Sequence, residues 1–365
     1  MTKAAELAKI GEVATNSQIG GRRNIIINGA MQVAQRGTSS TGLGAADGYF
    51  TLDRYKLLFA ATAGRLTMTQ TADGPSGFAN CLKLDCTTAD ASIAAGEYMI
   101  INHRIEGQDL QQIKKGTSDA ERVTISFYVK GNANATYMLE VNDEDNTRIN
   151  QNQFAVTTDW TRIEITLPPD TTGAFDNDTS HSLSLNMWLH SGSTFNSGTY
   201  TANTWVSKTN ANRAVGITSF FDSTDRTFFI TGLQLEVGSV ATPFEHRSFG
   251  EELSLCQRYY QVVPKYTFFN GAVEVGSASL RGGVPITRPL RASPTIGNIT
   301  LAVYDDDDNS FSNAAHAVFA NSGSYEVDGT TGFLSVIFNG NLSGRTDNHN
   351  VTALYGTDGT LDAEL

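Results

Sequence analysis

The chain has 365 residues, of which 18% are charged, and its formal net charge at pH 7 is −12. Since this length exceeds what one compact core usually needs, we expect two or three domains. The acidic charge excludes nucleic acid as the main partner, because phosphate binding needs a cationic surface, and the lack of about 18 consecutive apolar residues excludes a membrane-spanning helix.

The N-terminal segment, residues 1–21, is predicted to be a short helix followed by a hinge. Ala4, Leu7 and Ile10 recur at intervals of three and form a thin apolar stripe. A helix under about 12–15 residues is not stable alone, so Leu7 and Ile10 are predicted to dock onto identical helices or onto another protein. A frayed tail is the alternative. The segment is charged and has no apolar stretch, so it is not a secretory signal, and we expect synthesis and folding in a cytosol.

The next region is predicted to be an antiparallel jelly-roll sandwich over residues 22–247. It opens with the apolar run Asn24–Gly29, which is predicted to be a buried strand. Later segments alternate with period two and are separated by turn-forming residues, which is typical of half-buried strands, and a short helical turn is expected near Gly107–Ile113. The alternating strands are predicted at Arg65–Thr71, Asn80–Thr87, Glu97–Ile101, Arg122–Lys130, Tyr137–Val141, Trp160–Leu167, Ser182–His190 and Arg226–Val237.

A second helix, over residues 248–263, is predicted to link two β regions. Ser248 and Glu251 have the spacing of a capping box. Apolar residues then recur on one helix face. From 264 to 365 short strands return and predict a smaller C-terminal β-sandwich, and no period of about 20–50 residues indicates a solenoid. The chain is therefore predicted to be all-β with two short helices.

The three cysteines are too few for a disulfide framework. Cys81 and Cys86 lie at odd spacing in one predicted strand, so their side chains point to opposite faces. With Cys256, they are predicted to be small buried apolar residues.

Several stretches along the chain carry a recognisable pattern. Arg23–Gly29 is followed by Gln35–Gly37 and by Gly48–Tyr55, which reads GYFTLDRY. The later stretches are Arg104–Gly107, Val123–Lys130, Ile230–Gly238, Ala241–Glu245 and Cys256–Tyr260. Together they resemble a phage tail-fibre family with a carbohydrate-binding-module-like jelly-roll domain. The resemblance covers about residues 22–260, and its ending is the most specific part.

The resemblance implies a virion appendage protein, commonly a homotrimer, that meets host surface polysaccharide or assembles with other phage tail or capsid proteins. Tyr55 stands where the family often has a tryptophan, which leaves the fold unaffected. We therefore expect a non-enzymatic tail-fibre subunit, made in the bacterial cytoplasm and placed on the virion, that attaches by multivalent binding. A capsid-decorating head fibre or a tail adaptor without receptor contact is the alternative. A polysaccharide depolymerase is less favoured, because the sequence has no β-helical repeat.

Motifs for catalysis and metal binding are mostly lacking in the sequence. It has no Walker loop, no Gly-x-Ser-x-Gly elbow and no His-Glu-x-x-His pair. His181 and His190 are predicted to flank one strand as ordinary histidines. The acidic run Asp305, Asp306, Asp307 and Asp308 is predicted to be a solvated hairpin loop, with a Ca²⁺ site as the alternative because hard cations take clustered oxygens. No other cofactor is expected.

Aromatic residues supply the candidate glycan contacts, since sugar sites use aromatic faces with a few polar groups. Trp160 and Trp188 lie in predicted strands and are expected in the core. Trp205 lies in a Ser-, Thr- and Asn-rich loop with Tyr200 nearby, so these two are the predicted glycan-binding residues. A trimer-interface or loop-anchoring role is the alternative for Trp205.

Overall fold

The structure is a computed structural model. It describes residues 3–4, 22–264, 268–274, 279–297, 301–304, 317–319, 333–339, 350–355 and 358–365. The chain divides into two compact units, Met1–Glu252 with Leu365 and Leu253–Glu364. Every pair of named strands in the described ranges is antiparallel.

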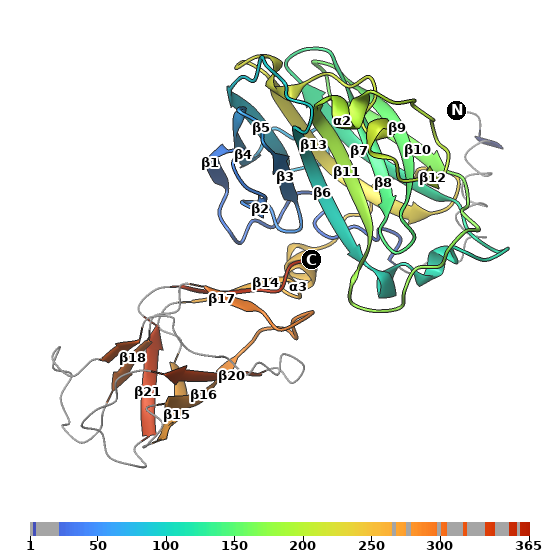
Figure 1. The fold of residues 1–365 in the computed structure, drawn as a ribbon. Coiled ribbons are helices and arrows are strands. Elements are labelled where there is room, and N and C mark those ends of the chain that lie inside the picture. The colour runs from blue at the N-terminus through green and yellow to red at the C-terminus, as the bar shows by residue number, and fades with distance from the viewer. Residues whose placement is uncertain are drawn as a thin grey trace. The chain divides into compact units, whose positions relative to one another are not determined.

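Within the described part of the first unit, two sheets face each other (Figure 1). Sheet A has the order β1 (Ser39–Leu43), β4 (Arg65–Thr71), β5 (Cys81–Thr88), β13 (Thr227–Val237), β7 (Val123–Gly131) and β10 (Thr161–Leu167). Sheet B has the order β12 (Val206–Ser207), β9 (Arg148–Val156), β8 (Ala135–Asp143), β11 (His181–Ser191), β6 (Tyr98–Glu106), β3 (Lys56–Ala60) and β2 (Gly48–Tyr49). The connections hold η1 (Gly107–Asp109), η2 (Gln111–Ile113), α2 (Ser193–Asn196), η3 (Asn210–Asn212) and η4 (Phe220–Asp222).

The two sheets pack through one hydrophobic core. Side chains alternate along each strand, so Tyr137, Leu139 and Val141 of β8 all turn inward and are buried. From the opposite sheets, the rings of Phe127 and Phe154 meet edge-on with their centroids 5.2 Å apart. This arrangement confirms the predicted all-β fold with an antiparallel jelly-roll sandwich.

A second apolar cluster lies on the outer face of sheet B, under residues 192–218, which we call the covering segment. Trp188 is fully buried there with Ile100 and Met138. The sequence predicts Trp188 as a core residue. It is buried, but outside the core between the sheets, because it alternates along β11 with Met187, which faces that core.

The predicted strand Asn24–Gly29 is wrong as an element, although Ile26 is fully buried. Its backbone meets β13 through only two bonds, Ile25 N–H to the Leu235 carbonyl (2.9 Å) and Leu233 N–H to the Gly29 carbonyl (3.0 Å), and asparagine side chains interrupt the pairing between them. Asn24 Oδ1 accepts from the backbone N–H groups of Ile26 (3.0 Å) and Leu235 (3.1 Å). Asn28 has a left-handed backbone (φ 61°), which ends the extended run.

Trp160 also differs from its prediction, since it is half-buried and precedes β10. The hydroxyls of Thr157 and Thr161 donate to the carbonyl of Asp159 at 3.1 and 3.3 Å, which closes a turn before the strand begins. The Trp160 ring contacts Phe229 edge-on, with centroids 6.2 Å apart.

The predicted linking helix is shorter than expected. Helix α3 covers Phe249–Cys256, and the N–H of Glu251 donates to Ser248 Oγ at 3.3 Å, as the capping box predicts. The prediction is wrong for the last residues, because Tyr260–Val263 forms strand β14. The boundary between the two units falls inside α3, and the domain limits predicted from sequence stay predictions.

In the second unit, the described strands form two sheets. One has the order β14, β22 (Gly359–Asp362) and β17 (Thr295–Gly297). The other has the order β19 (Ala317–Phe319), β18 (Leu301–Tyr304), β21 (Asn350–Tyr355), β15 (Phe268–Glu274), β16 (Ser279–Pro285) and β20 (Phe333–Asn339). All three cysteines of the chain are buried, as predicted. Among the described residues, no helix is long and apolar enough to cross a membrane.

The lowered pKa values of two histidines in sheet B make the stability of the first unit depend on pH. Burial, and then the charge of Arg54, hold the pKa of His103 well below its usual value. Burial, and then the charge of Arg104, lower the pKa of His181 to about 3. Both histidines take up a proton more readily in the unfolded chain. The free energy of unfolding should therefore fall as the pH drops from about 6.5 toward 3, by up to about 1.4 kcal/mol per pH unit for each.

Denaturant titrations between pH 7 and pH 4 measure this dependence. His181→Asn should reduce the slope of the unfolding free energy against pH, because the variant lacks one of the two groups that bind a proton on unfolding. A slope that is the same in this variant and in the native protein would contradict the assignment.

Candidate functional site

An open pocket of about 380 Å³ lies where the loop after β6 meets the loop between β10 and β11. Leu110 and Phe175 bring buried apolar groups to it, and exposed polar side chains surround them. This combination of an apolar surface with a few polar groups is typical of small-molecule sites. The lining residues are Leu110, Gln111, Lys114, Lys115, Thr117, Asp119, Ala174 and Phe175.

Lys115 fixes one wall of this pocket from inside the protein, since its side chain is only 2% exposed. Its Nζ lies 2.6 Å from Asp143 Oδ2 and 3.2 Å from Asp170 Oδ2. It also donates to the carbonyls of Thr172 (2.6 Å) and Gly173 (2.8 Å). One buried ammonium from the loop after β6 thus contacts oxygens at the end of β8 and in the loop between β10 and β11, which holds the two pocket loops together.

Asp170 takes part in a second contact that keeps it ionised. Arg148 donates to both of its oxygens, at 2.8 and 3.1 Å. Burial works to raise the pKa of Asp170, but the hydrogen bonds from Arg148 and Thr172 outweigh burial, and the net shift is downward. The wall of the pocket is therefore a charged network with few degrees of freedom.

The structure places the predicted glycan residues Trp205 and Tyr200 in different clusters. Trp205 is half-buried behind the pocket, where its Nε1 donates to the Pro168 carbonyl at 3.0 Å and Lys115 Nζ lies 5.8 Å from its ring centroid. These contacts are those of a loop-anchoring aromatic. Tyr200 packs on the outer-face cluster, and its hydroxyl accepts from Gln153 N–H at 3.0 Å. Sugar contact by either residue stays a prediction.

The other predicted site residues lie outside the described residues. These are the docking residues Leu7 and Ile10 and the acidic run Asp305, Asp306, Asp307 and Asp308. The docking role, the Ca²⁺ alternative and the trimer therefore stay predictions.

A row of polar side chains crosses the outer face of sheet B to the covering segment. Arg104 Nε donates to Asn102 Oδ1 (2.8 Å), and Asn102 Nδ2 donates to Asn186 Oδ1 (2.7 Å). Asn186 Nδ2 donates to Glu140 Oε1 at 2.9 Å, and Arg213 donates to both oxygens of Glu140 at 2.8 and 2.6 Å. Because these side chains use their hydrogen-bonding groups on one another, the row holds the covering segment on the sheet and does not offer those groups to a ligand.

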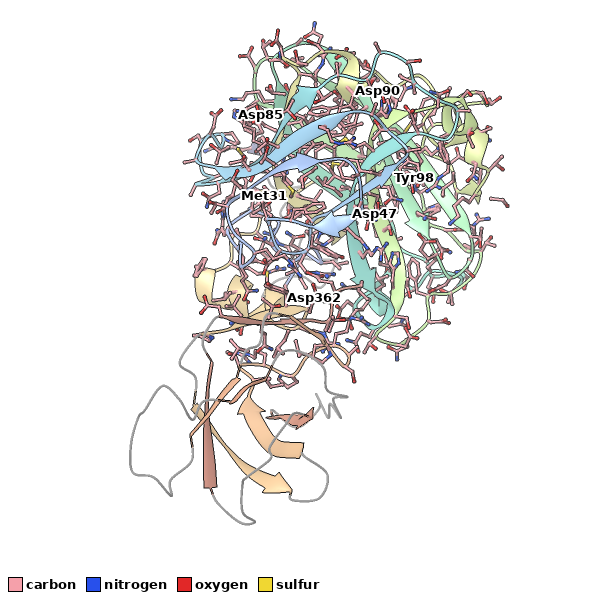
Figure 2. All side chains as sticks on the ribbon, turned by 60° about the vertical axis from the view of Figure 1, so that its left-hand side comes forward. Met31, Asp47, Asp85, Asp90, Tyr98 and Asp362 are labelled. Carbon is pink, nitrogen blue, oxygen red and sulfur yellow. The ribbon has the colours of Figure 1, made fainter. Side chains whose placement is uncertain are left out.

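Tyr98 lies at the apolar end of the same face. Its ring meets Phe195 of the covering segment edge-on, with centroids 5.4 Å apart. Burial, and then the carboxylate of Asp47, raise the pKa of the Tyr98 hydroxyl. Figure 2 labels both residues. The covering segment is therefore held at both ends, by charge at one and by aromatic packing at the other.

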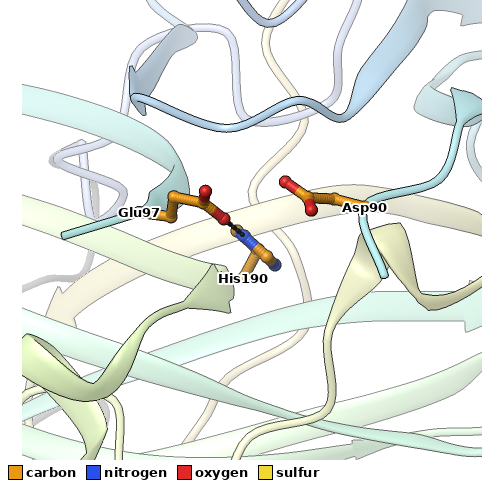
Figure 3. A group of neighbouring side chains, drawn as sticks. All are labelled: Asp90, Glu97 and His190. Atoms are coloured by element: carbon orange, nitrogen blue, oxygen red, sulfur yellow. Dashed lines mark ion pairs between the residues drawn. The ribbon is translucent and has the colours of Figure 1, made fainter. Parts of the chain in front are cut away.

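A separate group of Asp90, Glu97 and His190 lies where strands of both sheets end (Figure 3). Asp90 follows β5, Glu97 precedes β6, and His190 is near the end of β11. The register of β11 with β6 pairs His190 with Met99, two residues after Glu97, so strand pairing brings the imidazole to that carboxylate. One possible ligand atom from each side chain lies within 4.8 Å of the others, and all three side chains are buried.

Sequence reasoning missed both the pocket and this group. His181 and His190, predicted to flank one strand, both lie within β11, at its first and next-to-last positions. The sole sequence signal for the group is a histidine near a strand end, because about a hundred residues separate Asp90 and Glu97 from His190.

No family model and no curated protein sequence matches the chain. Solved structures of carbohydrate-binding modules are similar to its sandwich. The family 11 module of Clostridium thermocellum, in complex with a β-1,3-1,4-mixed-linked tetrasaccharide, is 12% identical, and the match covers 56% of this chain and 98% of the module with a TM-score of 0.27. A CBM4 structure is 8% identical over 57% of this chain and 97% of its own, with a TM-score of 0.30.

A third structure, TmCBM61 in complex with β-1,4-galactotriose, is 9% identical over 59% of this chain and 99% of its own, with a TM-score of 0.29. Identities and TM-scores this low carry no argument about what this chain binds. What the chain binds depends on the geometry of its own pocket and of its buried Asp90, Glu97 and His190.

Proposed function

We propose that this protein is a non-enzymatic attachment subunit of the phage tail-fibre type, and that its loop pocket binds one saccharide unit of a host surface polysaccharide. The observation that carries the proposal is the open pocket of about 380 Å³, with Phe175 beside exposed Gln111 and Asp119. A sugar has apolar C–H faces and hydroxyl groups, and this pocket is lined by the apolar Leu110 and Phe175 for the first and by hydrogen-bonding groups for the second. The resemblance of residues 22–260 to tail-fibre domains supports the same function.

The pocket is small and its polar rim is exposed, so a single site should bind a saccharide weakly. A proposed homotrimer carries three such sites, and several fibres on one particle multiply them. Linked weak sites gain avidity without any new contact, which suits attachment to a repetitive polysaccharide.

A glycan array of immobilised bacterial capsular polysaccharides and lipopolysaccharides tests the proposal, with isothermal titration for each saccharide that binds. Asp119→Ala should weaken binding roughly tenfold or more, because a hydrogen bond to a charged acceptor contributes about 1.5–3 kcal/mol. Asp159→Ala, an exposed aspartate in the turn before β10, is the matched control and should bind like the native protein.

Other outcomes separate the remaining functions. Binding that Asp119→Ala leaves intact would move the glycan site away from the pocket, and Trp205→Ala and Tyr200→Ala would then be the next variants. A protein that binds no glycan but assembles on particles would be a head fibre or tail adaptor. Release of reducing ends from a bound polysaccharide would identify a depolymerase.

A further inference from the structure

We propose that Asp90, Glu97 and His190 bind one divalent transition-metal ion of the zinc class, in a buried site separate from the pocket. The site joins the loop between β5 and β6 to the end of β11, and so it ties sheet A to sheet B. Figure 3 shows the two carboxylates facing the same imidazole from different directions.

The spacing of the three side chains suits coordination. Two ligands held about 2.1 Å from a tetrahedral ion are about 3.4 Å apart. His190 Nε2 and Glu97 Oε2 are 3.5 Å apart, and the third ligand, the Asp90 carboxylate, comes within 4.8 Å of both side chains. A small inward movement of Asp90 would complete three ligands and leave the fourth position for water.

Buried atoms without a hydrogen bond are the second observation. Among the described residues, neither His190 Nε2 nor Glu97 Oε2 has a hydrogen-bond partner, and the two atoms face each other only as an ion pair at 3.5 Å. His190 is fully buried. Asp90 and Glu97 are each 5% exposed, and among the described residues neither carboxylate pairs with a lysine or arginine. Two buried carboxylates without a cation are costly, so a bound metal ion supplies the charge that is otherwise missing.

Neighbouring groups orient the ligands, as they do around metal ions in proteins. Ser219 Oγ lies 2.7 Å from His190 Nδ1 and so turns the other ring nitrogen toward Glu97. Asp90 Oδ2 accepts from the Thr62 hydroxyl and from the Ala63 N–H, both at 2.9 Å. Asp90 Oδ1 accepts a longer bond from the Ser92 N–H at 3.3 Å, so the ring and this carboxylate are both held in place, while His190 Nε2 and Glu97 Oε2 have no hydrogen bond among the described residues.

The donor set selects the class of metal. One imidazole nitrogen with two carboxylate oxygens suits Zn²⁺, and Mn²⁺ or Fe²⁺ after it. Ca²⁺ and Mg²⁺ prefer oxygen ligands throughout, so the histidine disfavours them. The competing arrangement is metal-free, with a protonated His190 that pairs with Glu97 at 3.5 Å.

Metal content and thermal stability decide between them. Full-length, tag-free protein is stripped with a chelator and titrated with ZnCl₂, MnCl₂ or CaCl₂. We expect about one Zn²⁺ per chain by elemental analysis and a melting temperature that rises by several degrees with Zn²⁺ and not with Ca²⁺. Glu97→Gln and His190→Gln should each lose both effects.

His181→Gln is the matched control. His181 lies on the same strand as His190, about 30 Å away at about 3.3 Å per residue, so this variant should still bind the metal ion. Glu97→Gln should also change the melting temperature differently with and without the metal ion. In the chelated protein it removes a buried charge and should not lower the melting temperature, whereas with Zn²⁺ present it should melt below the native protein. Failure of native protein to bind Zn²⁺, or equal binding by the Glu97 and His190 variants, would overturn the proposal.

Discussion

Replacing Lys115 with methionine is expected to destabilise the first unit by about 3–5 kcal/mol, the usual cost of removing one partner from a buried ion pair. Asp143 is fully buried and Asp170 nearly so, and both lose the ammonium that lies 2.6 and 3.2 Å from their oxygens. Arg148 still neutralises Asp170, so most of the loss should come from Asp143. The carbonyls of the pocket loop lose their donor at the same time, and the pocket should loosen.

Denaturant titration followed by tryptophan fluorescence measures this effect selectively, because the three tryptophans of the chain, at positions 160, 188 and 205, all lie in the first unit. Lys114→Met is the matched control. Lys114 is the neighbouring residue and pairs with Glu121 at 2.7 Å, but on the surface, so its loss should not change the midpoint measurably. Adding Asp143→Asn to Lys115→Met should restore part of the stability, and a midpoint unmoved by Lys115→Met alone would refute the role of this network.

Arg213→Met is expected to cost a similar amount, about 3–5 kcal/mol, for the same physical reason on the other side of sheet B. Arg213 donates to both oxygens of Glu140, which is fully buried, and its guanidinium carbon lies 4.8 Å from the ring centroid of Trp188. Without it, Glu140 keeps one hydrogen bond from Asn186 and, among the described residues, no paired cation. The covering segment loses the contact that fixes its end to the sheet.

Two readouts separate this effect from general destabilisation. Limited proteolysis should cut first within residues 192–218, because local opening there exposes the backbone. The double variant Arg213→Met with Glu140→Gln should recover most of the stability, since it no longer buries an unpaired charge. Lys208→Met removes the more exposed pair with Glu144 and is the control that should keep the native proteolysis pattern. Equal loss in the single and double variants would show that packing, rather than charge, holds the segment.

The two networks differ in what they mean for function. The Lys115 network shapes the pocket that we propose for the saccharide, so its variants should weaken glycan binding together with stability. The Arg213 row closes the outer face of sheet B, so its variants should leave the pocket intact. Glycan titration of both variants, below the temperature at which they unfold, therefore tests whether the pocket or the outer face is the binding surface.

The sequence by itself determined the local elements of this protein. Alternation of apolar and polar residues predicts strands such as Arg65–Thr71, and the spacing of Ser248 and Glu251 predicts the start of α3. Both signals depend on neighbours within a few residues, because side-chain direction repeats every two residues in a strand and capping spans one helical turn. From such elements the all-β sandwich follows.

The tertiary structure alone decided the sites. Nothing in the spacing of Asp90, Glu97 and His190 predicts that they meet, since the pairing of β11 with β6 brings them together across about a hundred residues. The pocket likewise lies between two loops that are distant in the chain and that Lys115 joins. Asn24–Gly29 has the pattern of a strand, yet the Asn24 side chain accepts the N–H groups of Ile26 and Leu235 and interrupts the backbone pairing that a strand would use. Long-range pairing and burial choose among local possibilities, and a pattern of near neighbours contains no information about that choice.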